Sequence, residues 1–347
     1  MREVRRWRLV AGIVGGVVAL GGLMVGGTAS NAAPKTVQIA FFSYNTTPYP
    51  LAGFKAASAE AKKVGAKVTF LNSNNDPTLQ ATQMRDAITS GKYQAFYIWP
   101  NNAVALQSIV VQANAKGIKV GAADATLGST QDQATLKTEP GLTITAGTGL
   151  KEEANIAVAE IKKACTAKVG AGKPCSVAIM PGITAFPPDA YRIGLIQPAL
   201  AKTGYITSKL MPQGMYSTPG AQTSTLNFFQ SKPKVDVLYS FADQMIAGTI
   251  TAFKQLKLTP GKDVKLIGFG ASTEAVAGIK AGTWFASQAL YPATESKLAV
   301  KYLVQAVNGK KVPSVVDTYK LPGALSVIDA SALKSHPSFK PDWSYAG

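Results

Sequence analysis

Polar and aromatic side chains crowd into one turn near the start of the chain, directly after a short apolar run. The run Val37 to Phe42 gives way to Tyr44, Asn45 and Thr47, and Tyr49 follows before a helical pattern begins. In open parallel sheets, ligands bind beyond the carboxyl ends of the strands, where the loops gather. Hydroxyl, amide and aromatic groups at such a place predict hydrogen bonding and stacking to a small ligand. The two prolines of the turn also suit the start of a helix, and both interpretations can hold together.

The chain lacks the parts of a zinc site or of a histidine-based catalytic triad. Its single histidine, His336, lies in a proline-rich tail, and its two cysteines, Cys165 and Cys175, are not spaced as CxxC. Asp124 and Asp243 supply the residue type that sugar hydrolysis requires in a pair, but nothing in the sequence fixes their separation or raises one pKa. We therefore expect no metal, no cofactor and no enzymatic activity.

Short apolar runs alternate with segments of helical spacing along almost the whole chain. In the first series we expect strands at 37–42, 68–71, 95–99 and 118–123, and helices at 51–64, 79–89 and 103–115. The stretch 126–149, rich in Gly, Ser and Thr, interrupts this rhythm. A second series then predicts strands at 176–180, 205–210, 235–240, 264–269 and 284–290, and helices at 152–164, 189–202, 218–230, 244–256, 273–280 and 293–307. Such alternation implies an α/β fold of two doubly wound parallel-sheet lobes, with a cleft between them.

The first 32 residues have the pattern of a signal peptide. Four arginines among the first eight residues precede an uncharged run from Leu9 to Pro34, and the small residues Ser30-Asn31-Ala32 provide a cleavage site. We expect cleavage after Ala32 and a periplasmic, secreted mature protein; the alternative is an uncleaved anchor, since the run exceeds the roughly 18 residues that a span needs. Export to an oxidising compartment favours a disulfide between Cys165 and Cys175.

The chain is basic, with a formal net charge of +17. Four Arg and one Glu in residues 1–32 account for three of these charges and leave +14 on the mature chain. Only Arg85 and Arg192 remain there as arginines, and the lysines are scattered, whereas nucleic-acid readers rely on arginine forks and clustered basic stripes. We interpret the charge as a solvated surface and expect no nucleic-acid partner.

Several segments together carry a family resemblance. They are the turn NTTPYP with GFKAASAEAKKVGAKV behind it, NSNNDPTLQATQMRDAITSGKYQAFYIWPNN, KGIKVGAADA, YSFADQMIAGTITAF, VKLIGFGAS and ALSVIDASALKSHPSFKPDW. In these segments the chain resembles the periplasmic sugar-binding proteins of the ribose and galactose type, the solute-binding components of ABC transporters. The resemblance implies the type I periplasmic binding protein fold, with a three-segment hinge near Gly147, 290–292 and 316–319. It divides the chain into an N-terminal lobe, 33–147 plus 291–317, and a C-terminal lobe, 148–290 plus 318–347.

The resemblance also implies ligand contacts. Tyr49 stands where family members place an aromatic ring that stacks on a sugar, and Tyr216 looks like its counterpart in the other lobe. Asp124, at the end of a predicted strand, matches the carboxylate that accepts bonds from sugar hydroxyls. Gln288 lies two positions before Leu290, which stands where a hinge glutamine is expected. Tyr191 and Arg192 share the expected place of an arginine, the first by spacing and the second by type.

Other positions depart from the ribose-type pattern. Thr47 replaces an Asn, Ala125 an Arg, Ala242 an Asn and Gly270 an Asp. Most of the polar side chains that would bind the hydroxyl groups of a pentose or hexose are therefore missing. The departures imply a less hydroxylated, more aromatic or otherwise unusual ligand.

Two candidates have a second interpretation. Asp243 is equally suited to cap the helix that follows it, and Trp99 is of a type that usually packs in a core, although Pro100-Asn101-Asn102 directly after it favours the cleft.

We expect a monomer that captures a small, sugar-like neutral ligand and presents it to the permease of an ABC importer. Alternatives are a non-sugar ligand, such as an aromatic compound or a furanosyl signal, or delivery to a chemoreceptor. The predicted ligand-binding residues are Tyr44, Asn45, Thr47, Tyr49, Trp99, Asp124, Tyr191, Arg192, Tyr216, Asp243 and Gln288.

Overall fold

The computed structural model describes residues 36–125, 127–128 and 135–346, so the predicted signal peptide lies outside the described residues. The strands are β1 (Val37–Ser43), β2 (Ala66–Asn72), β3 (Ala95–Ile98), β4 (Lys119–Ala122), β5 (Ile144–Gly147), β6 (Cys175–Met180), β7 (Ile206–Leu210), β8 (Val237–Ser240), β9 (Lys265–Gly270), β10 (Ala286–Ala289), β11 (Val315–Asp317) and β12 (Val327–Asp329). The helices are α1 (Pro48–Lys63), α2 (Pro77–Thr89), α3 (Ala103–Ala115), α4 (Leu150–Val169), α5 (Pro187–Ala201), α6 (Thr218–Phe229), α7 (Asp243–Leu256), α8 (Thr273–Lys280), α9 (Pro292–Val307) and α10 (Ala330–Ser335), with a 3-10 turn η1 (Thr318–Lys320).

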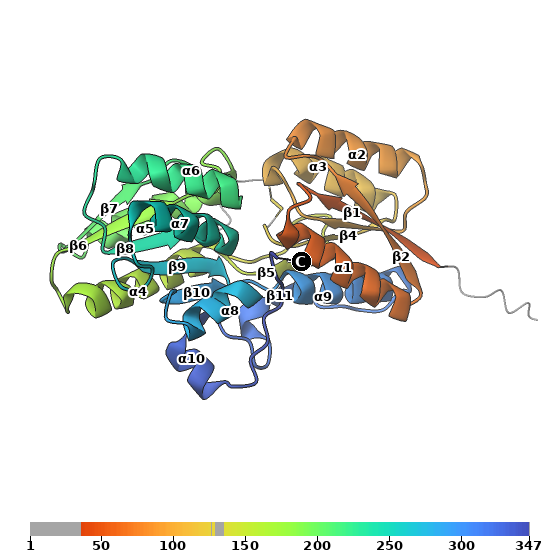
Figure 1. The fold of residues 1–347 in the computed structure, drawn as a ribbon. Helices are drawn as coiled ribbons and strands as arrows, with labels where there is room; N and C mark the ends of the chain where they lie inside the picture. The colour runs from red at the N-terminus through yellow and green to blue at the C-terminus, as the bar shows by residue number, and fades with distance from the viewer. Residues whose placement is uncertain (1–35, 126, 129–134, 347) are drawn as a thin grey trace, which may run out of the picture. The chain divides into compact units, whose positions relative to one another are not determined.

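The strands form two six-stranded sheets (Figure 1). The first has the order β11-β5-β4-β3-β1-β2 and the second the order β12-β10-β9-β8-β6-β7. Neighbouring strands are parallel except for the pair β10 and β12, which is antiparallel. The predicted fold of two parallel-sheet α/β lobes is confirmed.

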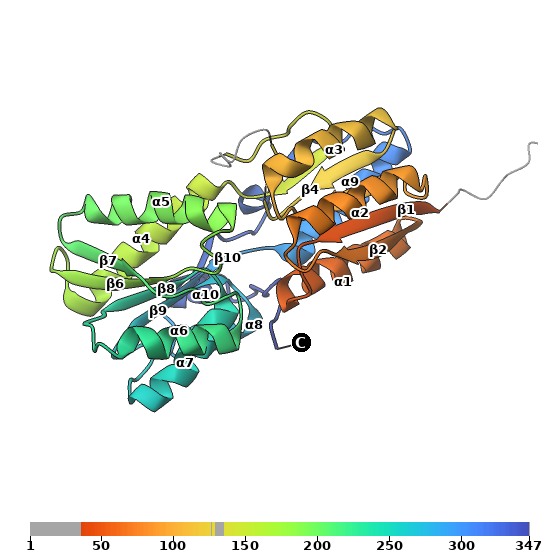
Figure 2. The same ribbon diagram turned by 90° about the horizontal axis from the view of Figure 1, so that it is seen from above.

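Side-chain alternation along the inner strands gives each sheet two buried faces. In β1, Phe41 packs into a core with α1 and α9, whereas its neighbour Phe42 packs into a separate core with α2 and α3. In the other lobe α4 packs with α5, and α6 packs with α7. Figure 2 shows these two pairs of helices on opposite faces of the second sheet.

Helix starts follow the local sequence. Asn102 and Ser272 accept backbone bonds from the first turns of α3 and α8, which begin and end where the sequence predicts. The prediction placed no strand in 126–149, and this is wrong, because β5 lies there. β5 is only four residues long and stands among Gly and Thr residues, so it carries no period-2 signal.

The chain passes between the two sheets three times, after β5, after β10 and after β11. At the first and third passages the Thr318 hydroxyl donates to the carbonyl of Gly147 at 3.2 Å. The residue boundaries of the lobes stay a prediction.

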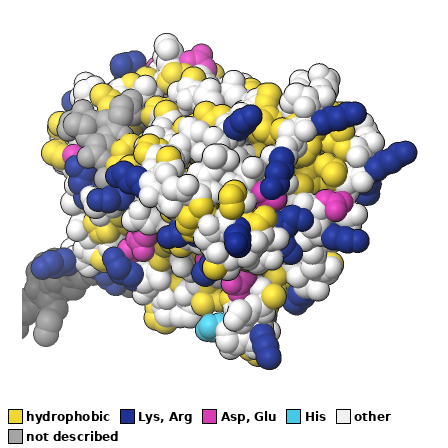
Figure 3. All heavy atoms as spheres, turned by 90° about the vertical axis from the view of Figure 1, so that its left-hand side faces the viewer, with side chains coloured by type: hydrophobic (Ala, Val, Ile, Leu, Met, Phe, Trp, Pro, Cys, Tyr) yellow, Lys and Arg dark blue, Asp and Glu magenta, His cyan; other side chains and the backbone are white. Residues whose placement is uncertain are grey.

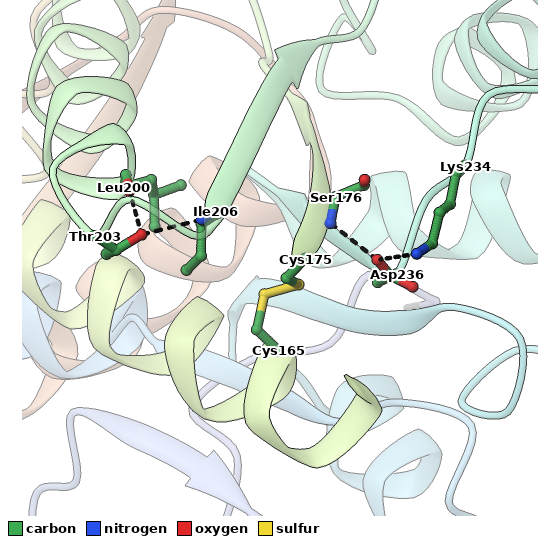
Figure 4. The surroundings of a disulfide bond; sticks show 8 residues. All are labelled: Cys165, Cys175, Ser176, Leu200, Thr203, Ile206, Lys234 and Asp236. Carbon is green, nitrogen blue, oxygen red and sulfur yellow. Dashed lines mark hydrogen bonds and ion pairs between the residues drawn. A yellow bond between two sulfur atoms is a disulfide. The ribbon is translucent and has the colours of Figure 1, made fainter. Parts of the chain in front are cut away.

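The two cysteines form a disulfide near one end of the second sheet (Figure 4). Cys165 belongs to α4 and Cys175 is the first residue of β6, and their Cα atoms lie 5.8 Å apart. Next to it, the backbone N–H of Ser176 donates to Asp236 at 2.9 Å, which fixes β6 beside the start of β8. The disulfide thus joins the C-terminal part of α4 to the start of β6.

Replacing both cysteines with serine is expected to lower the free energy of unfolding by about 2–3 kcal/mol. The chain-entropy model assigns this value to a loop of about ten residues. Chemical denaturation of the variant and of the oxidised wild type measures the difference. Reduced wild type, studied in the presence of a thiol reductant, should lose nearly the same amount; an unchanged midpoint on reduction would contradict the assignment.

On the face drawn in Figure 3, Lys and Arg side chains stand apart from one another among acidic, apolar and neutral ones, rather than in a stripe. Within the described ranges, no helix combines the length and the apolar character that a membrane crossing requires.

Candidate functional site

A cavity of about 600 Å³ lies where the loops at the carboxyl ends of both sheets meet. Its walls come from the loops after β1, β2, β3 and β4, from the loops after β6, β7, β8 and β10, and from the C-terminal tail. This is the position at which parallel sheets bind ligands. The volume suits a small molecule of sugar size.

The structure brings most of the predicted residues to the cavity wall. Seven line it: Tyr44, Asn45, Thr47, Tyr49, Asp124, Arg192 and Tyr216. Four do not: Trp99, Tyr191, Asp243 and Gln288.

The turn after β1 is held by its own side chains. Asn45 Oδ1 accepts from the backbone N–H and the hydroxyl of Thr47, at 3.0 and 2.8 Å, and Asn45 Nδ2 donates to Asn75 at 3.0 Å. Helix α1 begins at the next residue, Pro48. The proline therefore starts the helix, as one of the two interpretations of this turn predicted. The bonded turn holds the loops after β1 and β2 together and leaves Tyr44 and Tyr49 facing the cavity.

Asp124 is the carboxylate of the first lobe in this cavity. It follows β4 in a left-handed conformation, φ 65°, which Asp tolerates better than most residues. Burial raises the pKa of Asp124 to about 6, while the charge of Arg192 opposes this rise, Glu153 adds to it, and the hydroxyls of Tyr49 and Tyr44 again lower it. A half-buried carboxylate beside two tyrosine hydroxyls is an acceptor suited to ligand hydroxyls.

Arg192 is the cation on the opposite side, held by two buried carboxylates. Its Nε and terminal nitrogen contact Glu153 Oε2 at 2.9 and 2.8 Å, and another terminal nitrogen contacts Asp189 Oδ1 at 3.3 Å. The guanidinium carbon lies 5.1 Å from the centre of the Phe269 ring. Burial disfavours the charged guanidinium, but the attraction of Glu153, Tyr216 and Asp189 outweighs it and raises the pKa of Arg192. Its charge is thus already neutralised within the protein.

Tyr216 joins the same network. Its hydroxyl donates to Asp189, whose other oxygen accepts the backbone N–H of Ile183 at 2.8 Å. The ring lies directly over Gly182, where a Cβ would come within 2.2 Å of ring atoms. The ring of Tyr216 is therefore fixed in the wall rather than free to turn.

Two predicted residues support the wall from behind. Trp99 is fully buried, donates from Nε1 to the Tyr97 hydroxyl at 2.7 Å, and has its ring centre 5.3 Å from that of Tyr49. Asp243 is also fully buried, and its two oxygens accept from the backbone N–H of Ser272 at 2.7 Å and the hydroxyl of Ser287 at 2.7 Å. The capping interpretation of Asp243 is wrong, because the N-cap of α7 is Ala242.

The other two also lie outside the cavity wall. Gln288 donates to the backbone carbonyl of Glu153 at 3.2 Å and to the hydroxyl of Tyr319 at 3.3 Å, and it accepts from Tyr239 at 3.4 Å. These bonds use its amide to join β10 to α4 and η1. Tyr191 is half-buried on α5, one position before Arg192.

Glu295, which the sequence analysis did not single out, is buried where the three passages between the sheets meet. It belongs to α9, accepts from Thr318 at 3.5 Å, and has a second oxygen without a hydrogen-bond partner among the described residues. Burial, followed by repulsion from Asp124, raises the pKa of Glu295 well above its ordinary value. The hinge thus contains a carboxyl group that favours its neutral form.

Several wall residues were missed by the sequence analysis. Asn74 and Asn75 follow β2 just as the first turn follows β1, so the same signal of polar residues after a strand could have found them. Phe186 and Gln244 stand at the starts of α5 and α7, and the Phe186 ring lies 6.2 Å from that of Tyr44. Trp343 comes from the tail, and no local signal marks it.

The described residues contain no group of three or more His, Cys, Asp or Glu side chains that could hold a metal ion. The cavity wall instead combines aromatic rings with one carboxylate acceptor, a neutralised arginine and several amides. Such a wall can bind and orient a small molecule that carries both hydroxyl groups and apolar faces.

Comparisons with known proteins agree with this arrangement. The model of a family described as periplasmic binding protein domain matches residues 34–311. The ribose import binding protein RbsB of Bacillus subtilis (strain 168) is 27% identical over 263 residues, which cover 76% of this chain and 78% of that protein.

Solved structures show the same fold. One from Mycobacterium smegmatis, in complex with β-D-fucofuranose, has a TM-score of 0.73 at 18% identity and covers 87% of this chain and 94% of its own. An ABC transporter solute binding protein from Bacillus halodurans C-125 with bound myo-inositol has a TM-score of 0.73 at 18% identity and covers 88% and 98%.

Proposed function

Because the chain belongs to the family of periplasmic binding protein domains, we propose that it is the exported solute-binding component of an ABC importer for a small sugar or polyol. The observation that carries the proposal is the cavity, in which residues from the strand ends of both sheets surround one carboxylate, Asp124. Support also comes from the relative named for ribose import and from structures that hold fucofuranose and myo-inositol.

In the proposed mechanism the ligand bridges the two lobes. Tyr44, Tyr49 and Asp124 contribute contacts from the first lobe, and Tyr216 and the Arg192 network from the second. Only a closed arrangement lets one ligand use both sets, so ligand binding favours closure. The closed protein would then deliver the ligand intact to a membrane permease after export directed by residues 1–32.

The wall favours a ligand with fewer hydroxyl groups than a common hexose. Rings of Tyr44, Tyr49, Phe186, Phe269 and Trp343 border the cavity. Arg192 is committed to Glu153 and Asp189, so it offers a ligand less than a free guanidinium would. Deoxysugars and pentoses fit this combination of apolar surface and limited polar contact.

A thermal-shift screen of residues 33–347 tests the proposal. Sugars and polyols such as D-ribose, D-arabinose, D-allose, D-fucose and myo-inositol are compared with aromatic compounds and amino acids. A sugar present at about 100 times its dissociation constant should add roughly 2.7 kcal/mol of apparent stability. Stabilisation by non-sugar compounds alone, or recovery of a chemically altered sugar after incubation, would refute the proposed function.

A further inference from the structure

The C-terminal tail caps a helix of the first lobe. Asp342 accepts from the backbone N–H groups of Ala293 and Thr294 at 2.7 and 3.0 Å, and from the Thr294 hydroxyl at 2.7 Å. These groups form the first turn of α9, whose own N-cap residue, Tyr291, supplies no side-chain bond. α9 packs against α1 beneath the first sheet. One end of the tail is therefore fixed to the first lobe.

The residues that follow bind the second lobe. The backbone carbonyl of Trp343 accepts from the N–H and the hydroxyl of Thr273 at 3.0 and 3.2 Å. The indole N–H of Trp343 donates to the carbonyl of Gly270, at the end of β9, at 2.8 Å. Within two residues the tail has passed from a helix of the first lobe to a strand and a helix of the second.

One carboxylate of α8 then holds the last described residues. Glu274 accepts from the hydroxyl of Ser344, from the N–H of Tyr345 at 3.3 Å and from the N–H of Ala346 at 3.0 Å. Tyr345 also places its ring 6.3 Å from the Trp343 ring. This is a second anchor, formed by a side chain that does not line the cavity.

Between these anchors, the indole of Trp343 lines the cavity. The side chain is buried and meets the ring of Tyr49 edge-on, with ring centres 5.2 Å apart and an interplanar angle of 85°. A Cβ at Gly270 would lie 2.6 Å from the indole and 2.8 Å from an oxygen of Asp243. Any larger residue at 270 would therefore displace the indole from its place.

We propose that residues 342–346 form a strap between the lobes and that its Trp343 is a ligand-contacting residue that determines specificity; the second part rests on the proposed function. The single donor of the indole is used by Gly270, so Trp343 offers the ligand only apolar surface. A ligand hydroxyl turned toward it would lose water without gaining a partner, whereas a methyl or C–H group would pack. The strap therefore selects a ligand that is apolar at this corner of the cavity.

Titration calorimetry with pairs of sugars that differ in one hydroxyl group tests the specificity. The pairs are D-galactose with D-fucose and D-mannose with D-rhamnose. The wild type should prefer the deoxy member by at least about tenfold. Trp343→Phe should keep the preference, and Trp343→Gln, which offers donors and an acceptor, should abolish or reverse it. Trp284→Phe, at a tryptophan buried in the second lobe outside the cavity, is the matched control. An unchanged preference in Trp343→Gln would overturn the assignment.

The strap is tested without any ligand. The double variant Asp342→Ala/Glu274→Ala removes both anchors and changes no residue of the cavity wall. In small-angle X-ray scattering it should show a larger radius of gyration than the wild type, because the lobes separate further. An equal radius of gyration in the variant and the wild type would refute the strap, independently of the sugar-binding results. Failure of every sugar to bind the wild type would instead refute the proposed function and the sugar contact of Trp343, while the scattering experiment alone would still test the strap.

Discussion

Replacing Arg192 with methionine is expected to lower the free energy of unfolding by about 3–5 kcal/mol. The guanidinium lies between Glu153 and Asp189, which are 2% and 0% exposed. Its removal leaves two buried carboxylates facing each other without a cation, and the methionine also loses the contact with the Phe269 ring. Urea denaturation at pH 7 measures the loss.

The pH dependence separates this cause from a simple packing defect. Burial raises the pKa of Asp189, and the charge of Arg192 opposes that rise. Without the arginine this carboxyl binds a proton more readily in the folded state, so the deficit should shrink as the pH falls from 7 to 5. Arg85→Met, at an exposed position of α2, is the matched control and should change stability by less than about 0.5 kcal/mol. A pH-independent deficit, or a deficit no larger than that of the control, would show that the carboxylates do not depend on Arg192.

The sequence predicts this fold well because its signals are local and repeated. Buried strands such as β1 and β3 are mostly apolar, and α3 and α8 each begin after a capping residue, so their bounds could be predicted. β5, β11 and β12 could not, because β5 stands among Gly and Thr residues and β11 and β12 have three residues each. β11 and β12 are edge strands, which acquire their structure from pairing that becomes visible only when the sheet is assembled.

The site was predictable only where it depends on strand ends. Tyr44, Asn45 and Asp124 reach the cavity because each follows a strand of the first sheet, and the order of elements alone implies this. Asp243 stands between two wall residues, Ala242 and Gln244, and Gln288 lies two positions before a third, Leu290. The polar atoms of Asp243 and Gln288 are nevertheless bonded to partners far away in the sequence. No local pattern gives that orientation.

Trp343 shows the opposite case. It enters the cavity because Gly270, 73 positions earlier, leaves room for the indole and accepts its N–H. The sequence analysis noted that Gly270 replaces a polar residue expected from the resemblance, and it inferred only a lost contact. The structure shows that the space is filled, so the departure changes the chemistry of the wall rather than emptying it.

Replacing Asp124 with asparagine is expected to weaken sugar binding about 100-fold or more while stabilising the empty protein. Two charge-assisted hydrogen bonds contribute about 1.5–3 kcal/mol each, and the amide forms only the weaker neutral kind. In the folded protein without ligand, burial raises the pKa of Asp124 to about 6, above the value of about 3.9 in an unfolded chain. Because the folded state then binds the proton more tightly, ionisation of Asp124 destabilises the empty protein by about 1–3 kcal/mol at neutral pH.

The destabilisation by ionised Asp124 can be measured through its dependence on pH. The cost is fully present above about pH 6 and disappears as the pH falls through 6 toward 4, so Asp124→Asn should unfold at a higher urea concentration than the wild type at pH 8 but not at pH 4. Sugar binding by the wild type should weaken up to tenfold for each pH unit below 6, because the ligand prefers the ionised carboxylate; binding by the variant should not follow the pH. Asp86→Asn, on the exposed surface of α2, should leave both quantities as in the wild type. A variant that is less stable than the wild type at pH 8, or whose binding keeps the wild-type pH dependence, would mean that another group is the acceptor in this cavity.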